Sequence, residues 1–461
     1  MEKTLKGVPL GTNLGLFQLQ FALVSGRFLE SRGAVFPALD NLGLQADAVR
    51  RSSAALRKGR WKTQDLLDNW QKIVQKEGFF TPHCHGGYRP VPCDLTGFRR
   101  PQLKGNPAKH FVAEAGKALP AIIVGIAVAV GSIGNYQEEG ASSLVDPSIV
   151  EVPGIVEVPG AKRRFALPRL LVRWEQGDTR EADVQTRLIE QAGKTLTPEE
   201  VAVFDAGFSL AEVRAKTPRF VIRLAKNATM RRNFLPQYKG CGRHSEYGEI
   251  VRPLARTHAG KLLEATACDA TFGWEDEGIR LRAEVWHDVV LSEDKVGAQT
   301  VNVVAVFDPR YKEPWLLATN LEVTADNFAV TAEVVWRLYR DRWAVEHLPL
   351  VAKPMLGCSQ AFVFGEESRL RLPELALLCG NVLSYVAATS SAVATGFWDR
   401  MYRATCGRLR RVLNRLDFSE LPVVGEQLRK KASMTSHLKT GVEGHRRQKA
   451  VKLGQGVLLS A

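Results

Sequence analysis

Residues 201–224 read VAVFDAGFSLAEVRAKTPRFVIRL, and this stretch decides the class of fold. Residues 201–204 and 220–224 are apolar runs with the length of buried strands, and residues 210–214 between them have the spacing of a short helix. A strand, a helix and a strand in close succession predict part of an α/β sheet. Asp205 stands directly after the first of these strands, at the point where the chain turns toward the helix.

Further strands precede this stretch. We predict strands at 91–95, 121–130 and 165–174, with Pro168 near a strand start or at a bulge, and an amphipathic helix at 179–192. Three strands followed by alternating helices and strands predict a mixed sheet covered by helices, the order of an RNase H-like fold. Between the second and third strands the hexapeptide IVEVPG occurs twice in a row, at 149–160, which predicts a loop or hairpin extension.

The rest of the chain divides by composition. A helical region comes first, in which residues 42–70 have the pattern of a helix-turn-helix DNA-binding module or of a plain helical bundle. A β-rich insertion follows the first part of the core, and its Trp274, Trp286 and Trp315 are expected in core positions rather than stacked on a DNA base. The predicted regions are 1–85 (helical), 86–225 (RNase H-like core, first part), 226–325 (β-rich insertion domain), 326–400 (core, second part) and 401–461 (helical and basic).

The charge is strongly positive. Lys and Arg total 63 against 49 Asp and Glu, a formal net charge of +14. Residues 401–461 carry 13 Lys and Arg against 4 Asp and Glu, a net of +9. Such an excess favours polyanionic partners, nucleic acid first, although a basic protein without a nucleic-acid role is compatible with charge alone.

The cysteines indicate a reducing compartment. Seven cysteines without a CxxC pair argue against a disulfide framework or a zinc ribbon. The triplet His83-Cys84-His85 invites a zinc interpretation, but adjacent side chains of an extended chain point to opposite faces, which argues against a shared ion. No signal peptide is predicted, and the most apolar run, residues 121–130, is too short to cross a bilayer, so we expect no membrane partner.

The sharpest motif is Tyr339-x2-Arg342-x3-Glu346-x6-Lys353. Offsets of three, seven and fourteen place a phenol, a guanidinium, a carboxylate and an ammonium on one face of a helix. A carboxylate can hold a divalent metal while Arg and Lys grip phosphates beside it. The alternative is a solvated helix face. We expect Pro349 to kink this helix or restart it, and the intervening Leu338, Trp343, Val345 and Leu350 to pack against the rest of the fold.

This motif is similar to the Tyr-Arg-Glu-Lys signature of DDE transposases of bacterial insertion sequences, the IS-four type. Asp205-Ala206-Gly207-Phe208 resembles the segment around the second catalytic aspartate of that family, and residues 314–321 resemble the strand before the signature helix. The resemblance implies that the β-rich stretch between Asp205 and Glu346 is the insertion domain of these enzymes.

The first acid of such a site belongs on the first strand of the core. Asp94, in an Asp-x-Thr at the predicted strand end, is the best candidate. Asp146 and Asp178 lie in a turn or before a helix, and Asp269 falls inside the insertion. The alternative for Asp94 is a turn hydrogen bond at a strand end.

The resemblance implies a function. Asp94, Asp205 and Glu346 would hold two Mg²⁺ or Mn²⁺ ions, and Tyr339, Arg342 and Lys353 would bind DNA. The partners would be double-stranded transposon ends and target DNA, bound by a homodimer in a synaptic complex in the bacterial cytoplasm at the nucleoid. Two other classes stay open: a transposase-derived DNA-binding protein that no longer cleaves, and an RNase H-like nuclease without strand transfer.

Overall fold

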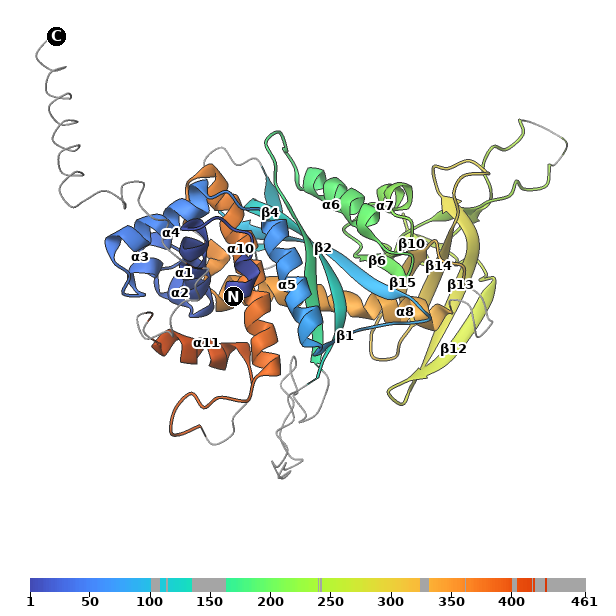
Figure 1. The fold of residues 1–461 in the computed structure, drawn as a ribbon. Helices are drawn as coiled ribbons and strands as arrows, with labels where there is room; N and C mark the ends of the chain where they lie inside the picture. Colours follow the sequence, from blue (N-terminus) through green and yellow to red (C-terminus); the bar gives the residue numbers. More distant parts are fainter. Residues whose placement is uncertain are drawn as a thin grey trace, which may run out of the picture.

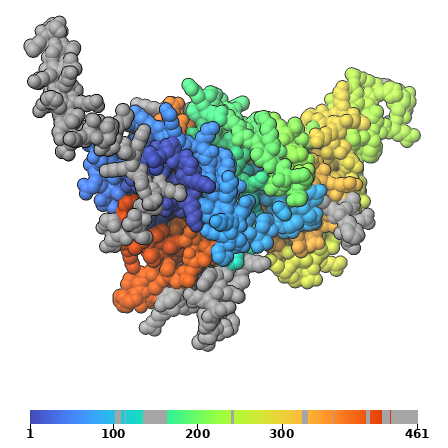
Figure 2. Space-filling view, in the orientation of Figure 1, coloured from blue at the N-terminus to red at the C-terminus, as the bar shows by residue number. Residues whose placement is uncertain are grey.

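The computed structural model describes residues 1–416, 418 and 428, apart from 101–107, 113–114, 135–162, 239, 241–242, 324–330, 361 and 400–403. The molecule is elongated: a helical end built from the N-terminal residues and the residues after about 350 adjoins a central sheet, and β-strands form the other end (Figure 1). In the space-filling view, the blue residues at the start of the chain lie against the orange residues from late in the chain (Figure 2). The IVEVPG repeat at 149–160 lies outside the described residues.

The helical end begins with the first 77 residues. Two of its helices, α4 and α5, are strongly amphipathic and bury one face each, as their apolar spacing predicts. Gly78, at φ +74°, ends α5 in the left-handed conformation that favours glycine. The elements are η1 (Glu2–Leu5), α1 (Thr12–Val24), α2 (Arg27–Glu30), α3 (Val35–Asp40), α4 (Ala46–Lys58) and α5 (Thr63–Glu77).

The central sheet is mixed. Its strands in chain order are β1 (Phe80–Pro82), β2 (Arg89–Arg99), β3 (Lys109–Val112), β4 (Lys117–Ile133), β5 (Arg163–Arg173), β6 (Glu200–Phe204) and β7 (Phe220–Arg223). β4 lies between β2 and β5 and is antiparallel to both, whereas β2, β6 and β7 are parallel neighbours. The order β5-β4-β2-β6-β7 is consistent with the RNase H-like arrangement that the sequence predicts.

Prolines occupy positions in this sheet that need no amide hydrogen. Pro90 and Pro92 lie where β2 pairs with β6 alone, because the pairing of β2 with β4 begins at Cys93. Pro168 lies at a register shift of β5, where Ala127 pairs with Leu170 but the next residue, Val128, pairs with Pro168. The predicted bulge at Pro168 is confirmed.

The β-rich segment after β7 extends the same sheet. β15 pairs with β7, and β14, β13, β8 and β9 follow outward, each antiparallel to its neighbour. β12 forms a hairpin with β13, and β10 pairs with β11 in a small separate sheet. The bounds are β8 (Met230–Arg232), β9 (Ile250–Val251), β10 (Arg256–His258), β11 (Lys261–Leu263), β12 (Ala270–Asp276), β13 (Ile279–Leu291), β14 (Val301–Phe307) and β15 (Trp315–Thr319).

Helices cover both faces of the sheet. α6 (Glu181–Thr195) and α7 (Leu210–Lys216) pack on one face, and α8 (Ala332–Arg340) packs on the other (Figure 1). After α8 the chain continues through η3 (Asp341–Glu346), α9 (His347–Leu350), η4 (Val351–Met355), η5 (Cys358–Gln360), α10 (Glu366–Thr389) and α11 (Cys406–Arg415). Trp286 and Trp315 are buried in the two cores of the sheet, which confirms their predicted core positions.

A third core joins the N-terminal helices to α10. Side chains of α1, α4 and α5 pack with α10 and with one face of β4 and β5. By length and composition α10 is apolar enough to cross a membrane: an 18-residue stretch of this helix has a mean hydropathy of 1.3. However, 83% of that stretch is buried inside the protein. α10 is therefore the central core helix of the helical end.

Candidate active site

Two acids meet where parallel strands run side by side. β2 and β6 pair with Arg89 opposite Glu200 and Pro92 opposite Val203, so the same register carries Asp94 to the level of Asp205. Asp205 follows directly after β6, as the sequence predicts. Asp94, however, lies in the middle of β2 and not at a strand end, because β2 continues to Arg99 against β4. Neighbouring strands are about 4.8 Å apart, which brings the two carboxylates close together.

The third acid is carried by the segment that follows α8. This segment is not one regular helix: α-helical turns alternate with the 3₁₀ turn η3 and the π-helical turn η4. Helical structure continues through Pro354, which lies inside η4. The π-type hydrogen bond from the Leu356 amide to Val351 O, at 3.0 Å, spans Pro354, which itself has no amide hydrogen to donate. η3 packs against β2, and this places Glu346 beside Asp94.

Arg342 joins the three acids. Its guanidinium lies 3.5 Å from Asp94 Oδ2, 3.8 Å from Asp205 Oδ2 and 2.9 Å from Glu346 Oε1. The last two oxygens contact the same nitrogen, so they are no farther apart than the sum of those two distances. Arg342 is buried, and its Nε has no hydrogen-bond partner among the described residues. One cation therefore neutralises part of a cluster of three carboxylates.

Burial and charge set the protonation of the site. Burial raises the pKa of Asp94 to about 6, and the Arg342 guanidinium and the Leu95 amide oppose that rise. Burial, together with the charge of Asp205, raises the pKa of Tyr339 to about 12. The Tyr339 hydroxyl therefore stays protonated and donates a hydrogen bond to Asp205 Oδ1 at 3.1 Å. This hydrogen bond orients the Asp205 carboxylate.

The other members of the motif lie close by. Lys353 Nζ is 5.3 Å from the ring centroid of Phe98, which lies on β2 four residues after Asp94. Tyr339 is fully buried, so contact of Tyr339, Arg342 or Lys353 with DNA stays a prediction. The expectation that Trp343 packs into the fold is wrong: it is 44% exposed, and the Arg342 guanidinium lies over its ring at 5.1 Å.

Leu350 is also exposed, at 59%, contrary to expectation. The 3₁₀ turn advances the side chains by a different angle than an α-helix does, so a face computed for a regular helix does not hold beyond Asp341. Leu338 and Val345 are buried as predicted.

The rivals for the first acid lie elsewhere. Asp178 is buried beside Arg187, and the Arg187 Nη2 atom lies 2.5 Å from Asp178 Oδ2. Asp269 binds both terminal nitrogens of Arg232, at 2.6 and 2.8 Å. Asp146 lies outside the described residues. Of the candidates that the structure describes, Asp94 is the one that contacts Arg342 together with Asp205 and Glu346.

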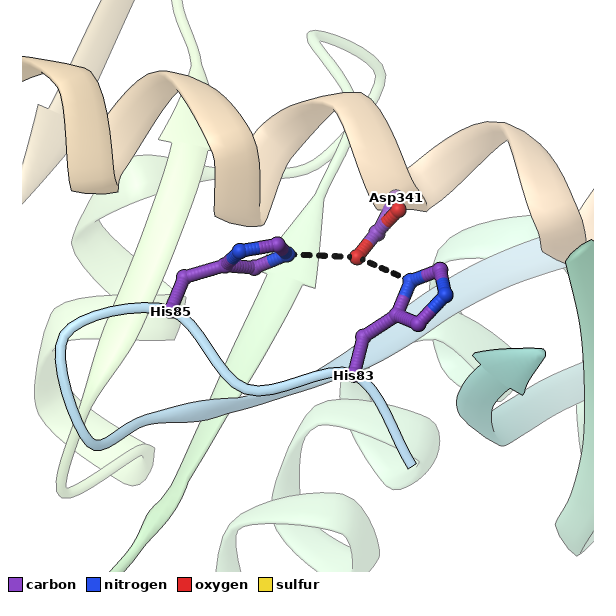
Figure 3. Close-up of side chains that lie close together, drawn as sticks. All are labelled: His83, His85 and Asp341. Carbon is purple, nitrogen blue, oxygen red and sulfur yellow. Dashed lines mark hydrogen bonds and ion pairs between the residues drawn. The ribbon is translucent and has the colours of Figure 1, made fainter. Parts of the chain in front are cut away.

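Sequence reasoning missed a second cluster, formed by His83, His85 and Asp341 (Figure 3). Adjacent residues of an extended chain point to opposite faces, but His83 and His85 are two residues apart and so lie on one face, which is why the reason for predicting no shared ion is wrong for this pair. Both rings bond to Asp341 Oδ2 at 2.8 Å. The His-x-His spacing could have indicated the two histidines. Nothing in the sequence around Asp341, 256 residues after His85, indicates that it is their partner.

We expect Asp94→Asn to stabilise the metal-free protein above about pH 4. The pKa of Asp94 is raised from its ordinary 3.8 to about 6, so the folded state holds a proton that the unfolded state has lost. Wild-type stability therefore falls as pH rises from about 4 to 6, and the asparagine variant avoids that loss. Chemical denaturation in chelator should show that the difference in free energy of unfolding between Asp94→Asn and wild type grows over this pH range and then stays constant.

Asp269→Asn is the control for this profile. Burial opposes ionisation of Asp269, but hydrogen bonds from Arg232 and the His287 amide leave its pKa below the usual value. Its stabilising contribution is therefore constant above about pH 5 and shrinks as pH falls below that, so the stability deficit of the variant should be the same at every pH above about 5 and smaller at pH 4. A gap for Asp94→Asn that does not change between pH 4 and 6 would contradict the assigned environment.

Comparison with known families agrees with this geometry. Residues 168–348 match the model of a family described as Transposase DDE domain. The matched range begins in β5, contains Asp205, Arg342 and Glu346, and ends before Lys353; Asp94 lies upstream of it. A search of curated proteins found no match. The family match and the mixed sheet support a DDE transposase, a class of metal-dependent enzymes that act on DNA.

Proposed function

We propose that this protein is a transposase of the IS-four type that cleaves DNA at transposon ends and joins those ends to target DNA. The observation that carries the proposal is the meeting of Asp94, Asp205 and Glu346 on the Arg342 guanidinium. The acids come from three separate parts of the chain, and a cluster of like charges is costly to assemble unless a cation is bound there. Such clusters are typical of metal-dependent catalytic sites.

The residues fit a pair of divalent ions. Asp94, Asp205 and Glu346 offer carboxylate oxygens, the ligands that hard cations such as Mg²⁺ and Mn²⁺ prefer. Their side chains are 29%, 37% and 41% exposed, so the carboxylates are open to solvent, as binding of an ion and of DNA requires. When bound, two ions would stabilise charge on the attacking and leaving oxygens of a phosphodiester. The three acids would hold that pair.

The neighbouring residues prepare the acids for this task. Arg342 compensates the carboxylates while no other cation is present and can turn to a DNA phosphate when one is. Tyr339, held protonated by burial, fixes Asp205 from the core side. Trp343 leaves an indole face exposed beside the acids, next to the Arg342 guanidinium.

The proposed partner is double-stranded DNA, the transposon ends and the target, bound by a homodimer in a synaptic complex. The formal charge of +14 favours a polyanion. α11 places Arg408, Arg410, Arg411 and Arg415 on one short helix at the helical end. The proposed location is the bacterial cytoplasm, at the nucleoid, where such DNA is found.

A strand-transfer assay tests the proposal. Purified protein is incubated with Mg²⁺ or Mn²⁺, a labelled duplex that ends in the terminal repeat of the element, and a supercoiled target plasmid. A transposase produces both cut ends and labelled plasmid. Cut ends without joined product would indicate an RNase H-like nuclease, and binding without cleavage would indicate a DNA-binding descendant of a transposase.

A further inference from the structure

The His83, His85 and Asp341 cluster has the form of a metal site separate from the three acids. The Nδ1 atom of His83 and the Nε2 atom of His85 each lie 2.8 Å from Asp341 Oδ2. All three ligand atoms lie within 4.8 Å of one another. Figure 3 shows the two imidazoles, carried by the segment between β1 and β2, facing the same carboxylate oxygen at the start of η3.

The backbone holds the two imidazoles in place. The His83 amide donates to Val130 O at 2.9 Å, which fixes this residue to β4. His85 and Tyr88 exchange two backbone hydrogen bonds, at 2.8 and 2.9 Å, around Gly86 and Gly87. Both glycines have positive φ, as this tight turn requires. The main chain at both histidines is therefore fixed, and the bonds to Asp341 Oδ2 set the directions of the two rings.

A second layer of contacts supports His83 as a ligand. Its Nε2 lies 2.7 Å from Ser132 Oγ. When Nδ1 binds an ion, the ring proton resides on Nε2 and is donated to this hydroxyl. Histidines that ligate metals almost always donate their other ring N–H in this way, which fixes the tautomer.

We propose that His83, His85 and Asp341 bind one zinc-type divalent transition-metal ion. Two imidazole nitrogens and one carboxylate oxygen suit Zn²⁺ and disfavour Mg²⁺, which takes oxygen ligands. Tetrahedral coordination places neighbouring ligand atoms about 3.3 Å apart, so the observed 2.8 Å contacts need to open only slightly. The half-buried histidines, 21% and 18% exposed, leave room for water as the fourth ligand.

The opposing charge nearby is Arg164. Its Nε lies 3.3 Å from Asp341 Oδ1, so it occupies the other carboxylate oxygen and leaves Oδ2 to the ion. Its positive charge weakens cation binding, and its side chain is 39% exposed, which limits that effect by solvent screening. Removing this charge by Arg164→Gln should therefore tighten zinc binding.

The ion would have a positioning role. Asp341 directly precedes Arg342, so an ion on Asp341 ties the segment between β1 and β2 to the turn that carries Arg342. The inference does not rest on the proposed function, because it concerns different ligands and a different metal. The affinity for zinc can be measured whether or not the protein cleaves DNA, so a failure of one proposal is distinguishable from a failure of the other.

Titration with Zn²⁺ tests the proposal. Full-length protein is stripped with chelator and titrated with Zn²⁺ by calorimetry, and the same sample is titrated with Co²⁺ to record the visible bands of tetrahedral cobalt. We expect one tight site per chain. The double variant His83→Gln/His85→Gln should bind at least about 100-fold more weakly, and Ser132→Ala about tenfold more weakly.

Three control variants should keep the affinity. His110→Gln changes another half-buried histidine that is paired with a carboxylate, Glu181, at 2.8 Å. Cys84→Ser changes the exposed thiol between the two ligands. Glu346→Gln changes the cluster of three acids and not the histidine site. Loss of zinc binding in this variant would therefore overturn the proposal.

When the variants fold, two further results contradict the proposed site. One is wild-type protein that binds Zn²⁺ no more tightly than the double variant, which would leave the cluster as a hydrogen-bonded clamp only. The other is Co²⁺ bound without tetrahedral bands. If the double variant does not fold, as judged by circular dichroism, the Ser132→Ala and Arg164→Gln variants decide: affinities equal to wild type in both would reject the site.

Discussion

Glu346→Gln should reduce metal-dependent cleavage of a transposon-end duplex by at least about 10³-fold. Glutamine keeps the shape of the side chain but removes the negative charge that a divalent ion needs. Stabilisation by a bound metal contributes several kcal/mol at the transition state, and each 1.4 kcal/mol corresponds to a factor of ten in rate. The measurement is single-turnover cleavage at saturating protein, with DNA affinity measured in parallel at the same salt concentration.

The DNA affinity of this variant should stay within about threefold of wild type, because contacts to phosphates come from cationic groups. Glu333→Gln is the matched control. Glu333 lies on α8, thirteen residues before Glu346, and pairs with Arg337 at 2.7 Å on the surface. It should cleave at the wild-type rate. Normal cleavage by Glu346→Gln would remove Glu346 from the mechanism.

Arg342→Gln should lower the free energy of unfolding by about 3 kcal/mol in chelator. The change leaves three carboxylates without the buried cation that each of them contacts. Removing one partner of a buried ion pair costs about 3–5 kcal/mol, and the lower end applies because the acids are partly exposed. Mg²⁺ should narrow this difference in the free energy of unfolding, because the acids bind the ion more tightly without the competing Arg342 charge, and an ion that binds only the folded state stabilises it.

Arg340→Gln is the comparison for this loss. Arg340 lies two residues earlier and pairs with Asp276, which keeps a second partner in Arg310. Its loss should cost about 1 kcal/mol or less, with no response to Mg²⁺. Denaturant titrations with and without Mg²⁺ check both variants. Equal stability of Arg342→Gln and wild type in chelator would show that Arg342 does not hold the acids together.

Local patterns predicted the sheet well. The apolar runs at 121–130 and 201–204 became β4 and β6, because a strand buried on both faces must be apolar on both faces. The strand ends were less predictable. β2 extends to Arg99 because it pairs with β4, and the sequence of β2 alone carries no information on how far its partner reaches.

The candidate site was predicted in its members but not in its arrangement. Asp205 follows from a strand end, and Glu346 follows from the motif that resembles a known signature. The position of Arg342 between three acids depends on how η3 packs against β2, a contact between residues about 250 positions apart. The partnership of Asp341 with two histidines is missing from the sequence analysis for the same reason.

The anomalous scattering of Mn²⁺ in crystals of the protein bound to transposon-end DNA tests the metal site of the three acids. We expect two peaks roughly 3.5–4 Å apart, with Asp94, Asp205 and Glu346 as their protein ligands and Arg342 turned toward a phosphate. If crystals with ordered DNA and with ordered ions elsewhere on the protein have no peak among these acids, the three carboxylates do not form the metal site.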